Sequence, residues 1–80
     1  MDDRVAIIAI LVSRPESVST INDYLHDYAD YIIGRLGLPY RQKAVNIISV
    51  VLDAPQDKVS ALAGKIGKLE GVTTQTLFSK

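Results

Sequence analysis

Two long apolar runs dominate the 80-residue sequence. Residues 4–12 (RVAIIAILV) are apolar at both alternating sets of positions after Arg4, and residues 44–52 (AVNIISVVL) are nearly so. A strand that is apolar on both faces is typical of a strand that is covered on both sides. The two runs therefore predict two central β-strands.

Two further segments carry apolar residues three and four positions apart, which is the spacing of one face of an α-helix. In the first helix we expect Ser13 to cap the backbone, with Pro15 in the first turn and Glu16 reaching back. We expect the second helix to start at residues 53–55 (DAP) and to stop at Gly71. The two apolar stripes are Val18, Ile21, Leu25 and Tyr28, and Val59, Leu62, Ile66 and Leu69.

Two weaker strands complete the pattern. Residues 31–38 (YIIGRLGL) contain two glycines and precede a predicted turn at residues 39–42, and residues 72–79 (VTTQTLFS) alternate with polar partners like an edge strand. The order strand-helix-strand-strand-helix-strand predicts an α+β, ferredoxin-like (βαββαβ) sandwich. Residues 1–80 would form one domain, with a four-stranded antiparallel sheet and two helices on one face.

The second face of the predicted sheet lacks a cover. Two helices on one side leave isoleucine, valine and leucine of the central strands exposed on the other, over an area that soluble monomers rarely tolerate. We therefore expect a homo-oligomer, a dimer or a tetramer, formed through sheet faces or edges. The alternative is an unusually apolar monomer.

The amino-acid composition argues against several classes of protein and site. Nine basic and nine acidic side chains give a formal net charge of zero, which argues against a dedicated nucleic-acid-binding protein. Without cysteine the chain can form neither a disulfide nor a thiolate metal site, and a cytoplasmic location fits best. The run at residues 5–12 is shorter than the about 20 residues of a membrane helix, so we expect no membrane partner.

The zero net charge is a cancellation between two parts of the chain. Residues 1–30 carry six acidic and two basic side chains, whereas residues 31–80 carry three acidic and seven basic ones. The acidic first helix and a second helix with several lysines therefore offer complementary surfaces, within one subunit or between copies.

One helix face could hold a metal ion. His26 is the only histidine, and the carboxylates around it lie within two turns of the same predicted helix. One imidazole without cysteine makes a poor site for a transition metal unless paired subunits combine their ligands, so a solvated helix face is the simpler interpretation. The residues of this alternative are Asp23, His26, Asp27 and Asp30.

Two other groups of polar residues suggest anion chemistry. Arg14, in the first strand-to-helix loop, could hold a phosphate while Asn46 orients a water molecule, an arrangement found in acylphosphatases. The loop offers no glycine-rich cradle of backbone amides, so we expect no catalytic residues. Arg35, with Arg41 and Lys43, surrounds the predicted hairpin and could bind an anionic effector.

Three segments carry a family resemblance: residues 31–40 (YIIGRLGLPY), residues 47–51 (IISVV) and residues 60–72 (SALAGKIGKLEGV). Together they make the chain similar to the iron-only hydrogenase system regulators, which are small stand-alone proteins. The resemblance implies an ACT-like fold, similar to the C-terminal domain of nickel-responsive repressors. It also implies a non-enzymatic, oligomeric regulatory role in hydrogenase systems.

The resemblance to ACT domains also implies where an effector would bind. ACT domains commonly bind small molecules at subunit interfaces, near the first strand-to-helix turn and the second helix. The corresponding stretches here are residues 13–16 and 53–58, which supply Ser13, Arg14 and Asp53 as candidate effector-binding residues, and the hairpin adds Arg35. The histidines, cysteine and DNA-binding segment of nickel-responsive repressors have no counterpart, so we expect no cofactor and no direct DNA binding. The expected regulator senses a small molecule at a subunit interface or acts through a protein partner.

Overall fold

The two apolar runs lie side by side at the centre of one sheet. A computed structural model describes residues 2–80. In it β1 (Asp3–Val12) pairs antiparallel with β3 (Val45–Pro55), so that Ile8 lies opposite Val50. The edge strands are β2 (Ile32–Tyr40), which pairs with β3, and β4 (Val72–Phe78), which pairs with β1. The resulting order β2-β3-β1-β4 confirms the predicted ferredoxin-like sheet, with β4 at an edge.

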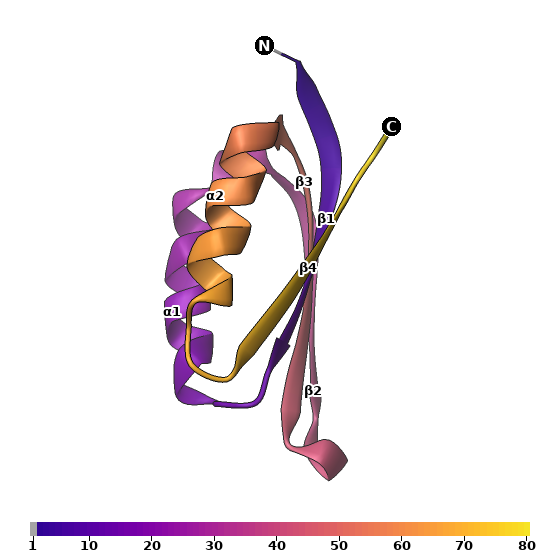
Figure 1. Ribbon diagram of the computed structural model, residues 1–80. Coiled ribbons are helices and arrows are strands. Elements are labelled where there is room, and N and C mark those ends of the chain that lie inside the picture. Colours follow the sequence, from indigo (N-terminus) through magenta and orange to yellow (C-terminus); the bar gives the residue numbers. More distant parts are fainter. Residues whose placement is uncertain (1) are drawn as a thin grey trace.

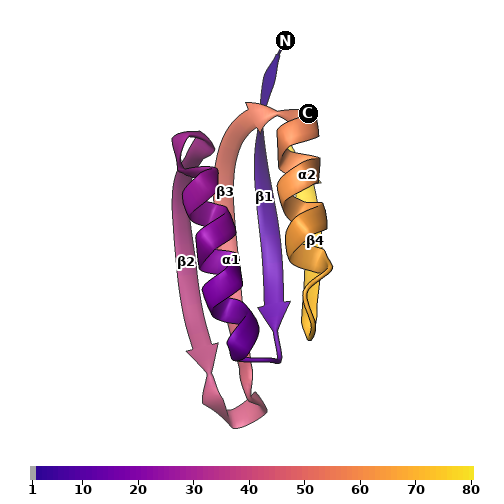
Figure 2. The same ribbon diagram turned by 90° about the vertical axis from the view of Figure 1, so that its left-hand side faces the viewer.

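Both helices cover the same face of this sheet. Figure 1 shows α1 (Glu16–Asp27) and α2 (Gln56–Gly67) on one side of the strands and none on the other. In Figure 2 α1 runs over β2 and β3, and α2 over β1 and β4. The two-layer α+β arrangement confirms the predicted fold class. No helix among residues 2–80 is long and apolar enough to cross a membrane.

The core lies between the helices and the sheet. It takes every second residue of β1 and β3 and the apolar stripes of both helices, because only those positions point into the space between the two layers. Tyr24, Tyr28 and Tyr31 pack at its border. The buried members are Ala6, Ile8, Ile10, Val12, Ile21, Leu25, Ile48, Val50, Leu52, Ala54, Val59, Leu62 and Ile66.

The expected start of the first helix is wrong in one respect. Ser13 does not cap α1, which has no side-chain cap at its first turn. Its backbone N–H and its hydroxyl both donate to the carbonyl oxygen of Gly71, at 2.8 and 3.1 Å. Ser17 adds a hydrogen bond from its hydroxyl to the carbonyl of Glu70, at 2.9 Å. The serines therefore join two loops that are far apart in the sequence.

The limits of the second helix also differ from the prediction. Residues 53–55 do not start α2, because they continue β3 opposite the first residues of β1 and bury Ala54. α2 ends at Gly67, four residues before the expected stop. Gly71 instead forms the turn into β4, with φ at +73°. A Cβ atom at this position would lie 2.9 Å from the Ser13 hydroxyl, so both conformation and space favour glycine.

Two short 3-10 helices replace predicted strand and turn residues. Ala29–Tyr31 form one, so β2 starts at Ile32 instead of Tyr31. Arg41–Lys43 form the other, which closes the β2–β3 hairpin and places the turn slightly later than expected. Ala44 follows it in the left-handed region, with φ at 52°. In Figure 1 this hairpin extends past the end of both helices.

Candidate functional site

The uncovered side of the sheet is as apolar as the covered side. Along β1, Ile8 is 0% exposed, whereas its neighbour Ile7 is 39% exposed. Leu36 of β2 and Leu77 of β4, the edge strands, are 64% and 67% exposed. We call this surface the outer face, and by strand register its central part consists of Val5, Ile7, Ala9, Leu11, Gly34, Leu36, Leu38, Ile47, Ser49, Val51, Thr73, Gln75 and Leu77. Tyr40 and Val45 continue the face at one end, and Asp3 and Asp53 continue it at the other.

The outer face is apolar, and it is not flat. Its two smallest central residues, Ala9 and Ser49, lie opposite each other between larger aliphatic neighbours. A hollow of about 330 Å³ opens near its end, between β1 and β4, with Ile7 and Leu77 among its lining residues. The surface is therefore uneven, and its two most exposed leucines, Leu36 and Leu77, lie on the edge strands.

Polar residues gather on the other side of the sheet, where α1 leaves β2 and the hairpin uncovered. Two adjoining hollows lie here, and both are lined by Pro39 and Asn46. The first, which we call the Ser13 hollow, has about 170 Å³ and is also lined by Tyr40 and Arg41. The second, which we call the Arg35 hollow, has about 210 Å³. Its lining includes Val18, Asn22, Arg35, Gly37 and Ile48.

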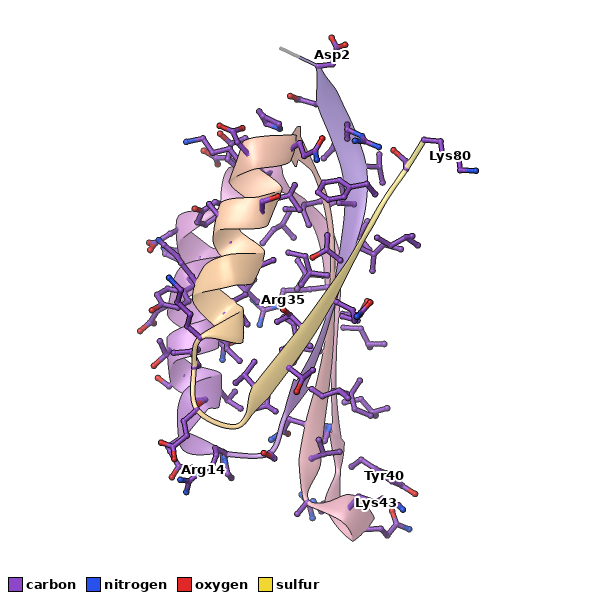
Figure 3. The ribbon with its side chains drawn as sticks, in the orientation of Figure 1. Asp2, Arg14, Arg35, Tyr40, Lys43 and Lys80 are labelled. Atoms are coloured by element: carbon purple, nitrogen blue, oxygen red, sulfur yellow. The ribbon has the colours of Figure 1, made fainter. Side chains whose placement is uncertain are left out.

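Arg35 reaches this hollow because of its position in β2. It lies opposite Val50, whose side chain is buried, so the register places Arg35 on the helix side of the sheet. Figure 3 shows Arg35 between the sheet and the helices. Its guanidinium donates to the side-chain oxygen of Asn22 on α1, at 2.7 Å. An arginine is thus held by a neutral amide at the border of an apolar core.

The structure places two of the four expected effector residues at adjoining hollows. Ser13 and Arg35 line adjoining hollows. Arg14 lies outside both hollows, and its guanidinium forms an ion pair with Glu70 at the surface. Asp53 lies opposite Val5, on the outer face, whereas Arg35 lies opposite Val50, on the helix side of the sheet. Within one chain, the sheet therefore separates Asp53 from the Arg35 hollow.

The helix face considered for metal binding is exposed. Asp23, His26, Asp27 and Asp30 all lie at the surface of the α1 side of the molecule. Within residues 2–80, no three histidine, cysteine, aspartate or glutamate side chains are close enough to hold one metal ion. A site shared between subunits stays a prediction.

The complementary charges of the two helices do not pair within the chain. In the part of the chain that the structure describes, the one ion pair joins Arg14 to Glu70. Lys65 of α2 instead lies over the rings of Tyr24 and Tyr28, at 5.3 and 5.6 Å from their centroids. The Arg14 pairing also leaves that side chain neutralised, which weakens the phosphate-binding role considered for it.

Sequence reasoning missed the residues that complete the Arg35 hollow. The sequence pattern does not single out Asn22, it suggests only a hydrolytic role for Asn46, and it presents Gly37 as a feature of a weak strand. A signal was present, because Asn46 is the polar residue in an otherwise apolar set of inward positions along β3. Arg35 and Gly37 are likewise inward positions of β2, which only the strand register reveals.

A comparison with models of known protein families shows the family of this chain. The TM1266-like family model, described as "Iron-only hydrogenase system regulator, putative", matches residues 4–76. The chain belongs to this family. Membership in the TM1266-like family confirms the resemblance carried by the hairpin and α2 segments. No curated protein matches the chain.

Solved structures give the same relationship. This TM1266-like chain is similar to the uncharacterized protein TM1266 from Thermotoga maritima, with 34% identity, a TM-score of 0.93, and coverage of 99% of this chain and 100% of that one. The C-terminal domain of MgtC from Mycobacterium tuberculosis shares the fold, at 10% identity and a TM-score of 0.78, over 98% of this chain and 89% of that domain. A formyltetrahydrofolate deformylase from Pseudomonas putida matches over 94% of this chain but 28% of its own, at 19% identity and a TM-score of 0.64.

Proposed function

We propose that this chain is a non-enzymatic, cytoplasmic regulatory protein that works as a homo-oligomer and responds to a small effector. The outer face carries this proposal, because it leaves a sheet with two apolar sides covered on one side only. Family membership supports the regulatory role. A protein partner that docks on the same face is the alternative way for the chain to act.

The size of the outer face fits a second copy of the chain. Four strands about 4.8 Å apart, with about eight paired residues at about 3.3 Å each, give a flat area of about 500 Å². Two such faces bury about 1,000 Å² before side-chain relief is counted, which is the lower bound for a specific interface. Two stacked sheets also keep the separation of about 10 Å that aliphatic side chains fill in a β-sandwich.

The relief and charge of the outer face also favour self-association. A two-fold axis brings the same patch of both copies together, so raised and small residues must match within one surface. The projecting Leu36 and the small Ala9 and Ser49 supply such a match, because all three occupy neighbouring positions in one row across the strands. None of the thirteen central residues of the face is charged, and the carboxylates of Asp3 and Asp53 lie at one end of it, so two copies can meet over the central part without burying an unpaired charge.

Strand β2 connects the effector site to the proposed interface between subunits. Arg35 and Gly37 lie on its inner side, at the Arg35 hollow, while Leu36 and Leu38 lie on the outer face. β2 is an edge strand that is hydrogen-bonded to β3 alone, so it can shift more easily than the central strands. An effector that binds one arrangement of β2 better than another would therefore change the affinity between subunits.

Light scattering tests the association directly. The wild-type chain is expected to have the mass of two or four chains. Leu36→Asp should weaken association by about a hundredfold or more, because it places a carboxylate inside an apolar interface. Ala61→Asp adds the same charge on the exposed side of α2 and should leave the mass unchanged. A monomeric wild type, or an equal effect of both variants, contradicts the proposal.

A further inference from the structure

We propose that the Arg35 hollow binds a small organic carboxylate with a short apolar body. This inference rests on the proposed function, because it names the chemical class of the effector and the residues that bind it. The site lies within one subunit, between α1 and the inner side of β2 and β3, and does not need a residue from a second copy.

The charge of the hollow calls for an anion. Arg35 has no acidic partner, since the single ion pair within residues 2–80 joins Arg14 to Glu70. Its guanidinium has five N–H donors, and within residues 2–80 its one side-chain hydrogen bond goes to the neutral oxygen of Asn22. A planar guanidinium matches the two oxygens of a carboxylate, with two parallel hydrogen bonds. One uncompensated positive charge suits a ligand with one negative charge.

Two amides provide further polar contacts. Asn22 orients Arg35 through its oxygen, which leaves its NH2 group as a donor. Asn46 lines both adjoining hollows, and its side chain makes no hydrogen bond to any of residues 2–80. A half-buried amide without a protein partner at the wall of a hollow is a natural contact for a bound polar group.

The remaining walls select a small apolar body. Val18 of α1 and Ile48 of β3 line the hollow beside Arg35. A volume of about 210 Å³ corresponds to about seven molecules of liquid water, which is enough for an acid of a few carbons. A phosphate is a poorer fit, because the lining supplies one cation and an apolar wall instead of several cations or a nest of backbone amides.

Gly37 keeps the hollow open. A Cβ atom built on Gly37 meets no other atom within 4 Å, so packing within the chain does not require glycine here. Its φ is not in the left-handed region, so the backbone does not require glycine either. A side chain at position 37 would extend from the inner side of β2 into the space where we place the ligand. A larger residue substituted for Gly37 would therefore fill the hollow without disturbing the core.

NMR titration of the ¹⁵N-labelled protein tests the site. The probes are sodium butyrate, butylamine as a ligand with the same apolar body and the opposite charge, and inorganic phosphate. Butyrate should produce saturable shifts of the Gly37 backbone amide, the Arg35 side-chain N–H and the Asn46 side-chain NH2. Butylamine should produce none, and phosphate should bind at least tenfold more weakly than butyrate.

Three variants separate this site from general attraction of anions. Gly37→Val and Arg35→Gln should each weaken butyrate binding at least tenfold, the first by occupying the hollow and the second by removing the charge. Lys43→Gln removes one charge from the hairpin tip, outside the lining of both hollows, and should bind butyrate like the wild type. Spectra of the free variants show whether each is folded, and Arg35→Gln tests the site even if Gly37→Val does not fold.

The failures of this inference and of the proposed function are distinguishable. Absence of saturable shifts with butyrate, wild-type binding by Arg35→Gln, or binding of phosphate as tight as that of butyrate overturns the carboxylate site. Light scattering on the same samples reports the oligomeric state independently. A dimer without butyrate binding rejects only this inference, whereas a monomer that binds butyrate rejects the oligomeric function and leaves the site.

Discussion

The two faces of the sheet contain the same kinds of residue and have different surroundings. Ile7 and Ile8 are adjacent in β1, yet Ile8 is 0% exposed beneath the helices while Ile7 is 39% exposed on the outer face. The same contrast separates Leu52 of β3 from Leu36 of β2, at 0% and 64%. The apolar residues of a strand therefore indicate that both faces of the sheet favour burial. The order of the elements shows which of the two faces the helices of the same chain cover.

The difference matters because the two faces should contribute to different equilibria. Burying an isoleucine side chain contributes about 1.5–3 kcal/mol relative to leaving it exposed. For Ile8 this free energy belongs to folding of the single chain. For Ile7, which is 39% exposed in the single chain, the remaining share becomes available only when a second copy covers the outer face. Substitutions on the two faces should therefore separate folding from association.

The largest expected effect comes from shortening an inner side chain. Ile8→Ala should lower the free energy of unfolding by about 2–5 kcal/mol, because it removes buried methyl groups and leaves a cavity. Ile7→Ala, studied by urea denaturation at a dilution where the chain is monomeric, should lower it by only about 1 kcal/mol. Equal losses in the two variants would remove the distinction between the faces.

A smaller effect should follow from adding one methyl group to glycine. Gly71→Ala should lower the free energy of unfolding by about 1–3 kcal/mol, because φ is +73° and the new Cβ atom meets the Ser13 loop. Gly34→Ala on the outer face meets no atom within 4 Å and should stay within about 0.5 kcal/mol of the wild type. Thermal or urea unfolding measures both, and a harmless Gly71→Ala would refute the tight contact between the loops.

The smallest effect is expected from salt. Between about 0.05 M and 0.5 M salt the dissociation constant of the oligomer should change by less than about threefold, because the central part of the outer face is uncharged. Sedimentation equilibrium measures this constant. If the acidic α1 met the basic α2 of another copy instead, association would weaken strongly with salt.

Most of the fold was predictable from the sequence because periodicity reports burial. The alternation in β1 and β3 and the stripes of α1 and α2 led to the correct element order and sheet. The ends of the helices were less predictable. Ser13 has a better partner in Gly71 than in the first turn of α1, and residues 53–55 extend β3 because β1 is available beside them. Both outcomes depend on contacts between segments far apart in the sequence.

The candidate site was predictable only in part. Arg35 was identified as a cation near the hairpin, but its access to the helix side depends on the pairing of β2 with β3. The role of Gly37 depends on the same register, and that of Asn22 on the position of α1 over β2. Arg14 and Asp53 lie at the positions that the resemblance to ACT domains implies. Glu70 pairs with the first, and the second lies on the outer face, away from the hollow.

The cover of the outer face can be observed directly by NMR on a mixture of ¹³C-labelled and unlabelled chains. Nuclear Overhauser effects filtered for contacts between copies should connect the methyl groups of Leu36, Leu11 and Ile47 to a second chain. The methyl groups of Ile8, beneath the helices, should show none. Absence of such contacts from the outer face, or contacts confined to α1 and α2, would contradict the claim that a second copy completes the sheet.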